Sequence, residues 1–185
     1  MEAKKFFIID FDSTFTQVEA LDVLGEISLA NHPEKRERLQ KIKDITDKGM
    51  DGGMSFRESL ERRLELLNAH KNHLDELVQK LSHKVSESFK RNREFFETNS
   101  ERIFILSNGF TEFITPIVTE YGIKPENVYA NQFTYDDQGN IDGFDKDNIL
   151  SSVFDFLNVT PKPVQEKTLK HTSDNLRDVV LNFDQ

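Results

Sequence analysis

Two short, continuously apolar runs mark the ends of a long polar stretch. One covers residues 6–9 and reads Phe-Phe-Ile-Ile, and the other covers residues 103–106 and reads Ile-Phe-Ile-Leu. Runs of this length are typical of strands buried on both faces, as in a parallel sheet covered by helices. A third strand is expected at residues 128–130, and a hairpin at residues 133–144. The pattern therefore predicts an α/β fold.

The stretch between the first two predicted strands has the periodicity of helices. Leucines recur at helical spacing in residues 60–67 and again in residues 74–81. A crossover between parallel strands needs only about a dozen residues or a little more, so most of this stretch is surplus. We expect a Rossmann-like core of residues 1–15 and 86–185, with residues 16–85 as an inserted helical cap. Alternatively, these helices belong to the main layer.

Composition narrows the classes of function. The net charge of −9 leaves no basic footprint for nucleic acid or an anionic membrane. The chain has no cysteine, which excludes disulfides and thiol nucleophiles. We find neither a membrane-spanning apolar run nor a signal-peptide pattern, and we expect a cytoplasmic protein. His70 and His73 lack an acidic partner motif, so a surface pair is favoured over a metal site.

Small polar residues directly follow the first two predicted strands. Residues 10–14 read Asp-Phe-Asp-Ser-Thr, and residues 107–109 read Ser-Asn-Gly. Ligands of open α/β sheets bind beyond the carboxyl ends of the strands, so both clusters lie where a site is expected. The hydroxyl and backbone N–H groups after the second aspartate could hold a phosphate at a helix N-terminus.

The carboxylates of Asp10 and Asp12 would project to the same side of the sheet if Phe11 packs inward. Two such charges raise each other's pKa. A Mg²⁺ ion on Asp10 would relieve this repulsion, and so would a division of labour between an ionised nucleophile and an acid or base. The plainer alternative is a strand end followed by an acidic turn.

The residues around these clusters resemble the haloacid dehalogenase superfamily of phosphatases. Residues 6–14 match its first motif, an apolar strand followed by Asp-x-Asp-x-Thr, and residues 103–107 match its second, an apolar strand ending in Ser or Thr. The segments DFDSTFTQVEALDVL, ILSNGF, YANQFTY and GNIDGFD further resemble the phosphoserine phosphatase branch. The resemblance covers about residues 5–30 and 50–150. It implies a Mg²⁺-dependent phosphomonoester hydrolase of serine biosynthesis that acts on O-phosphoserine, a small phosphorylated metabolite.

The resemblance also implies residue roles. Asp10 would attack phosphorus and form an aspartyl-phosphate, and Asp12 would protonate the leaving oxygen and then activate water. Mg²⁺ would bind the Asp10 carboxylate and the Asp12 main-chain carbonyl. Asn108 replaces one of the two glycines that usually follow the serine. The implied phosphate-binding residues are Thr14, Ser107, Asn108, Gly109 and Lys162.

Substrate specificity is expected from the helical insertion. By resemblance, Glu19 would receive the substrate ammonium and Arg63 would bind its carboxylate bidentately. Met50 and Phe56 match apolar residues near that pocket. Without the resemblance, Glu19 and Arg63 would be interpreted as solvated charges on helix faces.

The resemblance fades after about Asn148. Lys162 is the best match to the third-motif lysine, with Lys167 as a rival, and Asp184 is the only match to a fourth-motif acid that would also bind Mg²⁺. Truncation, an altered C-terminal sequence and divergence all remain open. Binding of a phosphorylated ligand without turnover is therefore the alternative function. A response-regulator receiver is disfavoured because its acceptor aspartate follows a later strand. The sequence does not indicate an oligomeric state.

Overall fold

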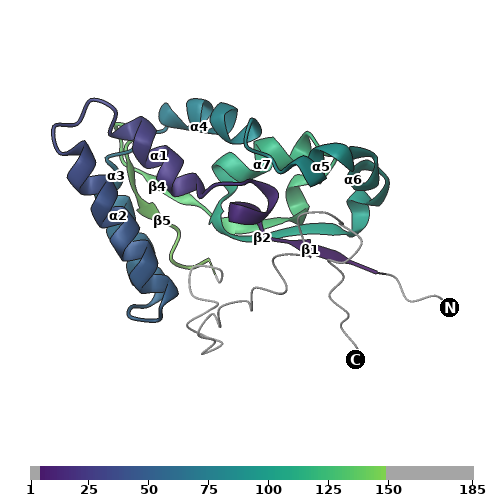
Figure 1. Ribbon diagram of the computed structural model, residues 1–185, viewed down its shortest axis with the longest axis horizontal. Coiled ribbons are helices and arrows are strands. Elements are labelled where there is room, and N and C mark those ends of the chain that lie inside the picture. Colours follow the sequence, from purple (N-terminus) through teal and green to yellow (C-terminus); the bar gives the residue numbers. More distant parts are fainter. Residues whose placement is uncertain (1–4, 149–185) are drawn as a thin grey trace.

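The computed structural model describes residues 5–148, which contain a parallel sheet with strand order β1-β2-β3 (Figure 1). The strands are β1 (Phe7–Ile9), β2 (Ile103–Phe110) and β3 (Val128–Asn131). In the register of the sheet, Phe7 pairs with Ile103 and Ile105 pairs with Val128. The predicted α/β fold class is confirmed.

Helices fill the stretch between β1 and β2, as the leucine spacing predicts. They are α1 (Ala20–Ser28), α2 (Lys35–Met50), α3 (Phe56–Leu67), α4 (His73–Ser82), α5 (Glu87–Arg91) and α6 (Arg93–Asn99), and α7 (Thr111–Thr119) follows β2. Short helical turns occupy Phe11–Phe15, Ser100–Arg102 and Pro125–Asn127. The division into core and cap stays a prediction. Within the described residues, no helix is long and apolar enough to cross a membrane.

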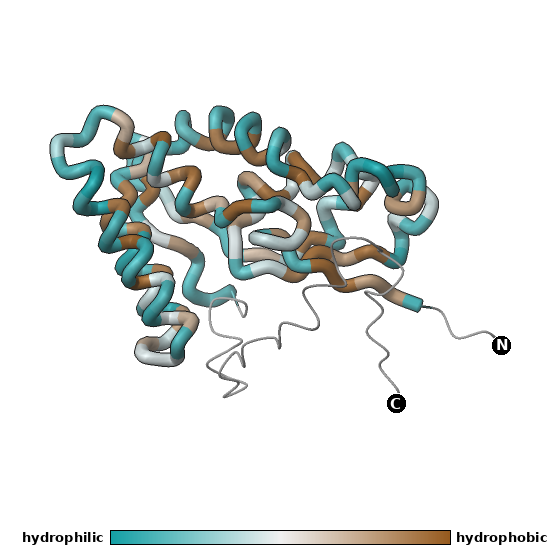
Figure 2. The backbone as a smooth tube through the Cα atoms, in the orientation of Figure 1, coloured by the Kyte–Doolittle hydropathy of each residue, from teal (hydrophilic) through white to brown (hydrophobic). Residues whose placement is uncertain are grey.

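Helices α1, α2 and α3 pack closely at Gly25. A Cβ atom at this position would lie 3.0 Å from Leu39 Cδ2 and 3.1 Å from Leu67 Cδ2, so a larger residue would require both leucine side chains to shift. Figure 2 shows α2 as largely hydrophilic, and Ile42 is its one buried residue. Because α2 contributes so little apolar surface, the fit at Gly25 matters for its attachment.

Phenylalanine rings fill the space between the sheet and its helices. Phe11 and Phe15 are fully buried, and their rings stack with centroids 5.8 Å apart. Phe110 stacks on Phe133 with centroids 3.7 Å apart, and Phe7 of β1 meets Phe95 of α6 edge to face. The burial of Phe11 satisfies the condition under which Asp10 and Asp12 project to the same side.

The expectation of strands buried on both faces is wrong for the described part of the chain. Burial alternates along most of β2, while β1 has two half-buried residues followed by the buried Ile9. Phe6, Leu106 and Tyr129 keep 50%, 44% and 49% of their surface exposed. The physical reason is that the helices that contact the strands, α6 and α7, pack against the alternate side chains.

The predicted hairpin is present as β4 (Phe133–Tyr135) and β5 (Ile141–Phe144), which pair antiparallel. Although we assigned it to the core, β5 packs against α3. Main-chain hydrogen bonds join it to the linker after α3, from Ile141 N to Ala69 O at 2.9 Å and from Lys71 N to Gly139 O at 3.0 Å. The hairpin and the inserted helices are therefore mechanically connected.

Two histidines stabilise this linker through their ring nitrogens. His70 Nδ1 accepts from Asn72 N at 3.0 Å, and His73 Nδ1 accepts from His70 N at 3.0 Å. His70 Nε2 lies 3.0 Å from Gln138 O in the hairpin turn. Each imidazole must be neutral to accept at Nδ1, so the linker geometry depends on their protonation. The pair serves a structural role at the surface, in line with the favoured prediction.

We predict that replacing His73 with Asn reduces the loss of stability at low pH. Burial, and secondly the charge of His70, lower the pKa of His73 below 6.5. Its contribution to stability is therefore present above the unfolded-state pKa and is lost as pH falls through the lower folded-state value. His73→Asn keeps an acceptor but does not titrate. Thermal melts from pH 8 to pH 5 should show a smaller fall in Tm than in wild type, and parallel curves would contradict the role.

Candidate active site

The site begins at the carboxyl end of β1, where the chain turns sharply. Asp10 Oδ1 accepts a hydrogen bond from Phe11 N at 2.7 Å, and Asp12 Oδ1 accepts from Ala20 N at 2.8 Å. Phe11 is buried beneath them. The two carboxylates are thus fixed by the backbone groups of the turn and of helix α1.

Loss of water, more than mutual repulsion, raises the pKa of both carboxyl groups. Asp10 keeps an exposed surface, and partial shielding of its carboxyl group from water raises its pKa to about 6, against the lowering effect of the Phe11 N–H and with a smaller raising effect of Glu19. Burial raises the pKa of Asp12 to about 7, followed by the charge of Glu19, with Asp10 making a smaller contribution. The expected repulsion is thus present at Asp12, but it is smaller than the effect of burial. The result is a pair in which Asp12 holds its proton to higher pH.

The second polar cluster, at the end of β2, lies against this pair. A Cβ atom at Gly109 would be only 3.2 Å from Asp12 Oδ2 and 3.0 Å from Ile114 Cδ1. Ser107 is buried, with 4% of its surface exposed, and its Oγ accepts from Gly109 N at 3.0 Å. The polar residues are part of β2 rather than a loop after it, since the strand continues to Phe110 with a shift of register against β3.

Asn131, at the end of β3, is a residue that we did not predict. It is fully buried, and its Nδ2 donates to Asn108 O at 2.9 Å. Its Oδ1 is buried and, within the described residues, has no hydrogen-bond partner. A buried polar group of this kind is uncommon and calls for a functional or structural explanation. The only signal in the sequence was an Asn at the end of an apolar strand.

We predict that Asn131→Asp destabilises the fold more than Asn131→Ala. The aspartate would put an oxygen where Nδ2 now donates, facing the Asn108 carbonyl. Loss of the hydrogen bond alone should cost about 0.5–1.5 kcal/mol, and the buried repulsion adds to this. Urea unfolding at pH 7.5 measures the free energy of unfolding of each of the two variants. Asn72→Ala, at an exposed position before α4 whose side chain makes no capping hydrogen bond, is the control. Equal stability of the Asp and Ala variants would mean that Asn131 does not hold Asn108.

The residues expected to select the substrate come from α1 and α3. Glu19 precedes α1, and its Oε1 accepts from Ser13 Oγ at 2.5 Å. Arg63 of α3 is 9% exposed, and its Nε donates to Ser59 O at 3.4 Å. Among the described residues Arg63 makes no ion pair, yet the charges of Asp22, Glu19 and Asp12 all raise its pKa against the larger lowering effect of burial. Arg63 is thus a buried cation near the first cluster.

Asp22 is a second residue that we did not predict. Among the charges around Arg63, its effect on the Arg63 pKa is the largest. Burial, and secondly Glu19, raise the pKa of Asp22. Asp22 lies in the first turn of α1, three residues after Glu19, which is the N-cap residue of this helix. This spacing was the available signal, and it was hidden among the other charges of the chain.

Other predicted residues have less defined positions. Thr14 is exposed, and its carbonyl accepts from Ser86 Oγ at 2.9 Å. Met50 ends α2 with 67% of its surface exposed, and Phe56 is half-buried at the start of α3. Lys162 and Asp184 lie outside the described residues.

The carboxylate oxygens of this cluster are the type of ligand that a cation such as Mg²⁺ prefers. Asp10 and Asp12 bring two carboxylates close to Glu19, and no cationic side chain forms an ion pair with them within residues 5–148. In the same part of the chain, no three His, Cys, Asp or Glu side chains come together as a metal site. The described residues therefore show a pair of carboxylates but no complete set of metal ligands.

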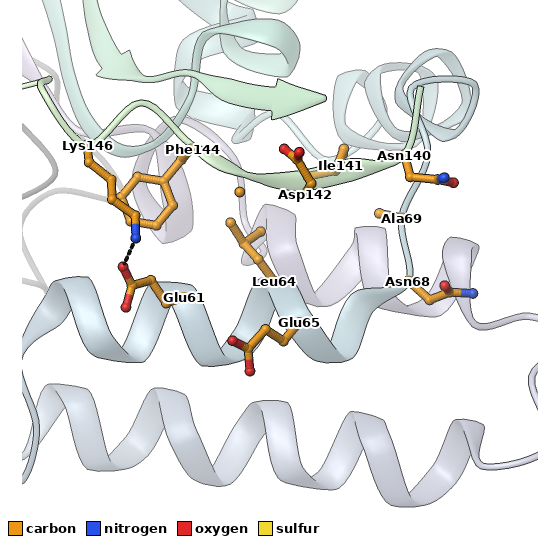
Figure 3. Close-up of a pocket in the computed structure, with 11 residues that line it drawn as sticks. Glu61, Leu64, Glu65, Asn68, Ala69, Asn140, Ile141, Asp142, Phe144 and Lys146 are labelled. Carbon is orange, nitrogen blue, oxygen red and sulfur yellow. Dashed lines mark ion pairs between the residues drawn. The ribbon is translucent and has the colours of Figure 1, made fainter. Parts of the chain in front are cut away.

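A separate cavity of about 360 Å³ lies between α3 and the hairpin. Figure 3 shows Glu61 reaching Lys146, and these two form an ion pair at 2.7 Å. Glu65 and Asp142 add further negative charge to its lining. None of the predicted site residues lines this cavity, so it is distinct from the aspartate pair.

Comparison with known proteins finds phosphoserine phosphatases among the relatives of similar sequence. No family model matches the chain. It is 26% identical over 145 residues to the phosphoserine phosphatase of Drosophila melanogaster, covering 78% of this chain and 51% of the relative. It is 29% identical over 134 residues to that of Lactococcus lactis, covering 72% and 57%. The chain thus spans about half the length of these relatives.

Solved structures agree in fold. A phosphoserine phosphohydrolase-like protein from Francisella tularensis superposes with a TM-score of 0.70 at 29% identity, covering 84% of this chain and 73% of that one. A phospho-aspartyl intermediate analogue of phosphoserine phosphatase gives a TM-score of 0.60 at 21% identity, covering 77% and 62%. The predicted resemblance is confirmed by these similarities in sequence and fold.

Proposed function

We propose that this chain, which has the fold of haloacid-dehalogenase phosphatases and a sequence similar to phosphoserine phosphatases, hydrolyses phosphomonoesters and prefers O-phosphoserine. The observation that carries the proposal is the meeting of the two strand-end clusters, with Gly109 of β2 packed against Asp12. A phosphoryl group placed there would lie between a carboxylate nucleophile and the polar groups at the end of β2, which include the Ser107 hydroxyl. The substrate is thus a small, soluble phosphorylated metabolite in the cytoplasm.

The two raised pKa values support different roles for the carboxylates. With its pKa raised to about 6, Asp10 is mostly ionised at neutral pH and is the group to attack phosphorus. As its oxygen bonds to phosphorus, the ester oxygen departs and takes a proton from Asp12, whose pKa is raised to about 7. Asp12 then takes a proton from water, which attacks the aspartyl-phosphate and releases phosphate and free Asp10.

Mg²⁺ is proposed as the cofactor, and the Asp10 carboxylate and the Asp12 carbonyl would hold it. When bound, it offsets charge on the phosphoryl group. Asp184 is proposed as a further ligand and Lys162 as a further phosphate contact, both beyond the described residues. Ser107, Asn108, Gly109 and Thr14 complete the proposed phosphate site.

Specificity for an amino acid is supported by the charges beside the aspartate pair. Arg63 is a guanidinium without an ion pair in the described residues, and it is suited to a carboxylate, which it can bind with two hydrogen bonds. Glu19 is suited to an ammonium group. Met50 and Phe56 are proposed to contact the apolar part of the ligand. A ligand with both charges on one carbon matches this pair better than a neutral alcohol phosphate.

A phosphate-release screen with Mg²⁺ tests the proposal. The panel contains O-phosphoserine, O-phosphothreonine, a sugar phosphate, a nucleotide monophosphate and p-nitrophenyl phosphate. We expect the highest kcat/KM with O-phosphoserine and no release after chelation of the metal. Release from no substrate would overturn the enzymatic proposal. Calorimetric titration with O-phosphoserine would then test the alternative, which is binding without turnover.

A further inference from the structure

The first backbone N–H of helix α1 is bound by a side chain from the preceding loop and not by the N-cap residue. Glu19 occupies the N-cap position of α1, yet its side chain makes no capping hydrogen bond. Asp12 Oδ1 instead accepts from Ala20 N at 2.8 Å, from seven residues before the cap. N-cap side chains ordinarily accept from the first turn of their own helix. Asp12 takes the N–H of Ala20, and Glu19 makes no capping hydrogen bond to the later residues of the first turn, so the Glu19 carboxylate is released from its helix and can face another group.

Ser13 is the group that holds the released carboxylate. Its Oγ donates to Glu19 Oε1 at 2.5 Å. Ser13 reaches this position because its backbone is left-handed, with φ of 55°. Non-glycine residues rarely adopt such values, and they cluster at sites where the surrounding structure holds them for function. The strained backbone at Ser13 therefore coincides with the contact that fixes Glu19.

The hydrogen-bond capacity of a hydroxyl group excludes a simpler role for Ser13. A serine has a single O–H donor, and here it is directed at Glu19. A phosphoryl group near neutral pH mainly accepts hydrogen bonds, so Ser13 Oγ cannot donate to it while holding Glu19. Glu19 Oε2 has no hydrogen-bond partner within residues 5–148 and is left for a cation.

We propose that Ser13 is a positioning residue, which orients Glu19 through the hydroxyl contact and so sets the preference for phosphomonoesters that carry an ammonium group. This inference rests on the proposed function. Ser13 itself touches no reacting atom. It fixes one carboxylate oxygen, so that the other is presented to the substrate in one orientation rather than several.

The test compares two substrates that differ in one group. O-phosphoserine carries the ammonium, and 3-phosphonooxypropanoate lacks it. Ser13→Ala should lower kcat/KM for O-phosphoserine by about tenfold, mostly through KM, because one hydrogen bond to a charged group is lost. The change for 3-phosphonooxypropanoate should stay within about threefold. Ser13→Gly should show the same selectivity loss, since it lacks the hydroxyl but adopts the left-handed backbone without strain.

A double-mutant cycle with Glu19→Gln shows whether the effect passes through Glu19. In that background Ser13→Ala should change the ratio of kcat/KM values between the substrates by less than about twofold, since coupled residues are not additive. Equal losses on both substrates would overturn the proposal and assign Ser13 to the phosphate site or the loop. Wild-type selectivity in Ser13→Gly would attribute any defect of Ser13→Ala to the backbone.

A stability cycle separates this inference from the proposed function. If wild-type protein releases phosphate from neither substrate, the proposed function fails and the substrate preference fails with it. The Ser13–Glu19 contact is then decided by thermal melts of a second cycle that uses Glu19→Ala, because a glutamine would still accept from Ser13 Oγ. We expect Ser13→Ala to lower Tm less in the Glu19→Ala background than in wild type. Additive changes in Tm would show that the contact is absent in solution.

Discussion

Replacing Asp10 with Asn should abolish phosphate release and leave the fold intact. The amide is not a nucleophile, and loss of a nucleophile typically costs roughly 10⁴-fold or more in kcat. The change is nearly isosteric, and the amide oxygen can still accept from Phe11 N, which donates to Asp10 at 2.7 Å. The defect should thus lie in chemistry and not in structure. Phosphate release from O-phosphoserine with saturating Mg²⁺ is the measurement.

The same variant should be at least as thermally stable as wild type at pH 7.5. The folded-state pKa of Asp10 is raised from 3.8 to about 6. A carboxyl group whose pKa is higher in the folded state than in the unfolded state stabilises the fold at low pH, and this stabilisation is lost as pH rises through the folded-state pKa. The ionised Asp10 therefore destabilises the metal-free fold near neutral pH. The asparagine in Asp10→Asn stays neutral at pH 7.5 and at pH 4. Melts without metal should therefore separate the two proteins at pH 7.5 and bring them together near pH 4.

A matched variant checks that the effect belongs to the site. Asp137→Asn changes an exposed aspartate in the turn between β4 and β5 and should keep wild-type activity and Tm. Beryllofluoride, which mimics an acyl phosphate, should raise the Tm of wild type with Mg²⁺ but leave Asp10→Asn unchanged. Phosphate release by Asp10→Asn at more than a few per cent of the wild-type rate would mean that another group attacks phosphorus.

Apolar patterning was enough to predict most of the architecture. The runs at residues 6–9 and 103–106 correspond to β1 and β2, and leucine spacing predicted α3 and α4. These signals are local, because a buried strand or helix face repeats with its own period. The end of β2 was missed for the same reason. Ser107 and Asn108 are polar, and they lie in the register shift between Leu106 and Phe110, the two residues of β2 that pair with β3 on either side of them.

Contacts between distant segments were not predictable in this way. The hairpin was assigned to the core, and the hydrogen bonds that attach it to the linker after α3 are between main-chain atoms. Main-chain groups are nearly the same in every residue, so the residue types do not indicate which segments form these hydrogen bonds. Asn131 and Asp22 were missed because their importance comes from a neighbour on another element, Asn108 in one case and Arg63 in the other.

The site was predictable only as far as its residues lie in short motifs. Asp10 and Asp12 follow one strand at fixed spacing, and the close approach of Gly109 to Asp12 follows from adjacent parallel strands. Arg63 and Glu19 were expected from resemblance, not from spacing. Their proximity depends on the packing of α1 against α3, which no local pattern encodes.

Replacing Arg63 with Ala should reduce hydrolysis of O-phosphoserine far more than hydrolysis of p-nitrophenyl phosphate. Arg63 has 9% of its surface exposed and makes no ion pair within residues 5–148, so its terminal nitrogens remain available to a carboxylate. Loss of a charged hydrogen-bonding partner is worth roughly 1.5–3 kcal/mol, or about tenfold to a hundredfold in kcat/KM. Arg63→Lys should recover only part of this, because an ammonium group binds a carboxylate as a point charge.

The neighbouring arginine provides the control for this experiment. Arg62 lies on the same helix with 54% of its side chain exposed and pairs with Glu58 at 2.6 Å, so Arg62→Ala removes an equal charge from the surface of α3. It should change kcat/KM for both substrates by less than about twofold, since exposed pairs of this kind contribute little. The ratio of the two kcat/KM values is the decisive quantity, because instability would lower both together. A ratio unchanged in Arg63→Ala would assign Arg63 to the packing of α3 against α1 and would leave the preference for phosphoserine supported by similarity alone.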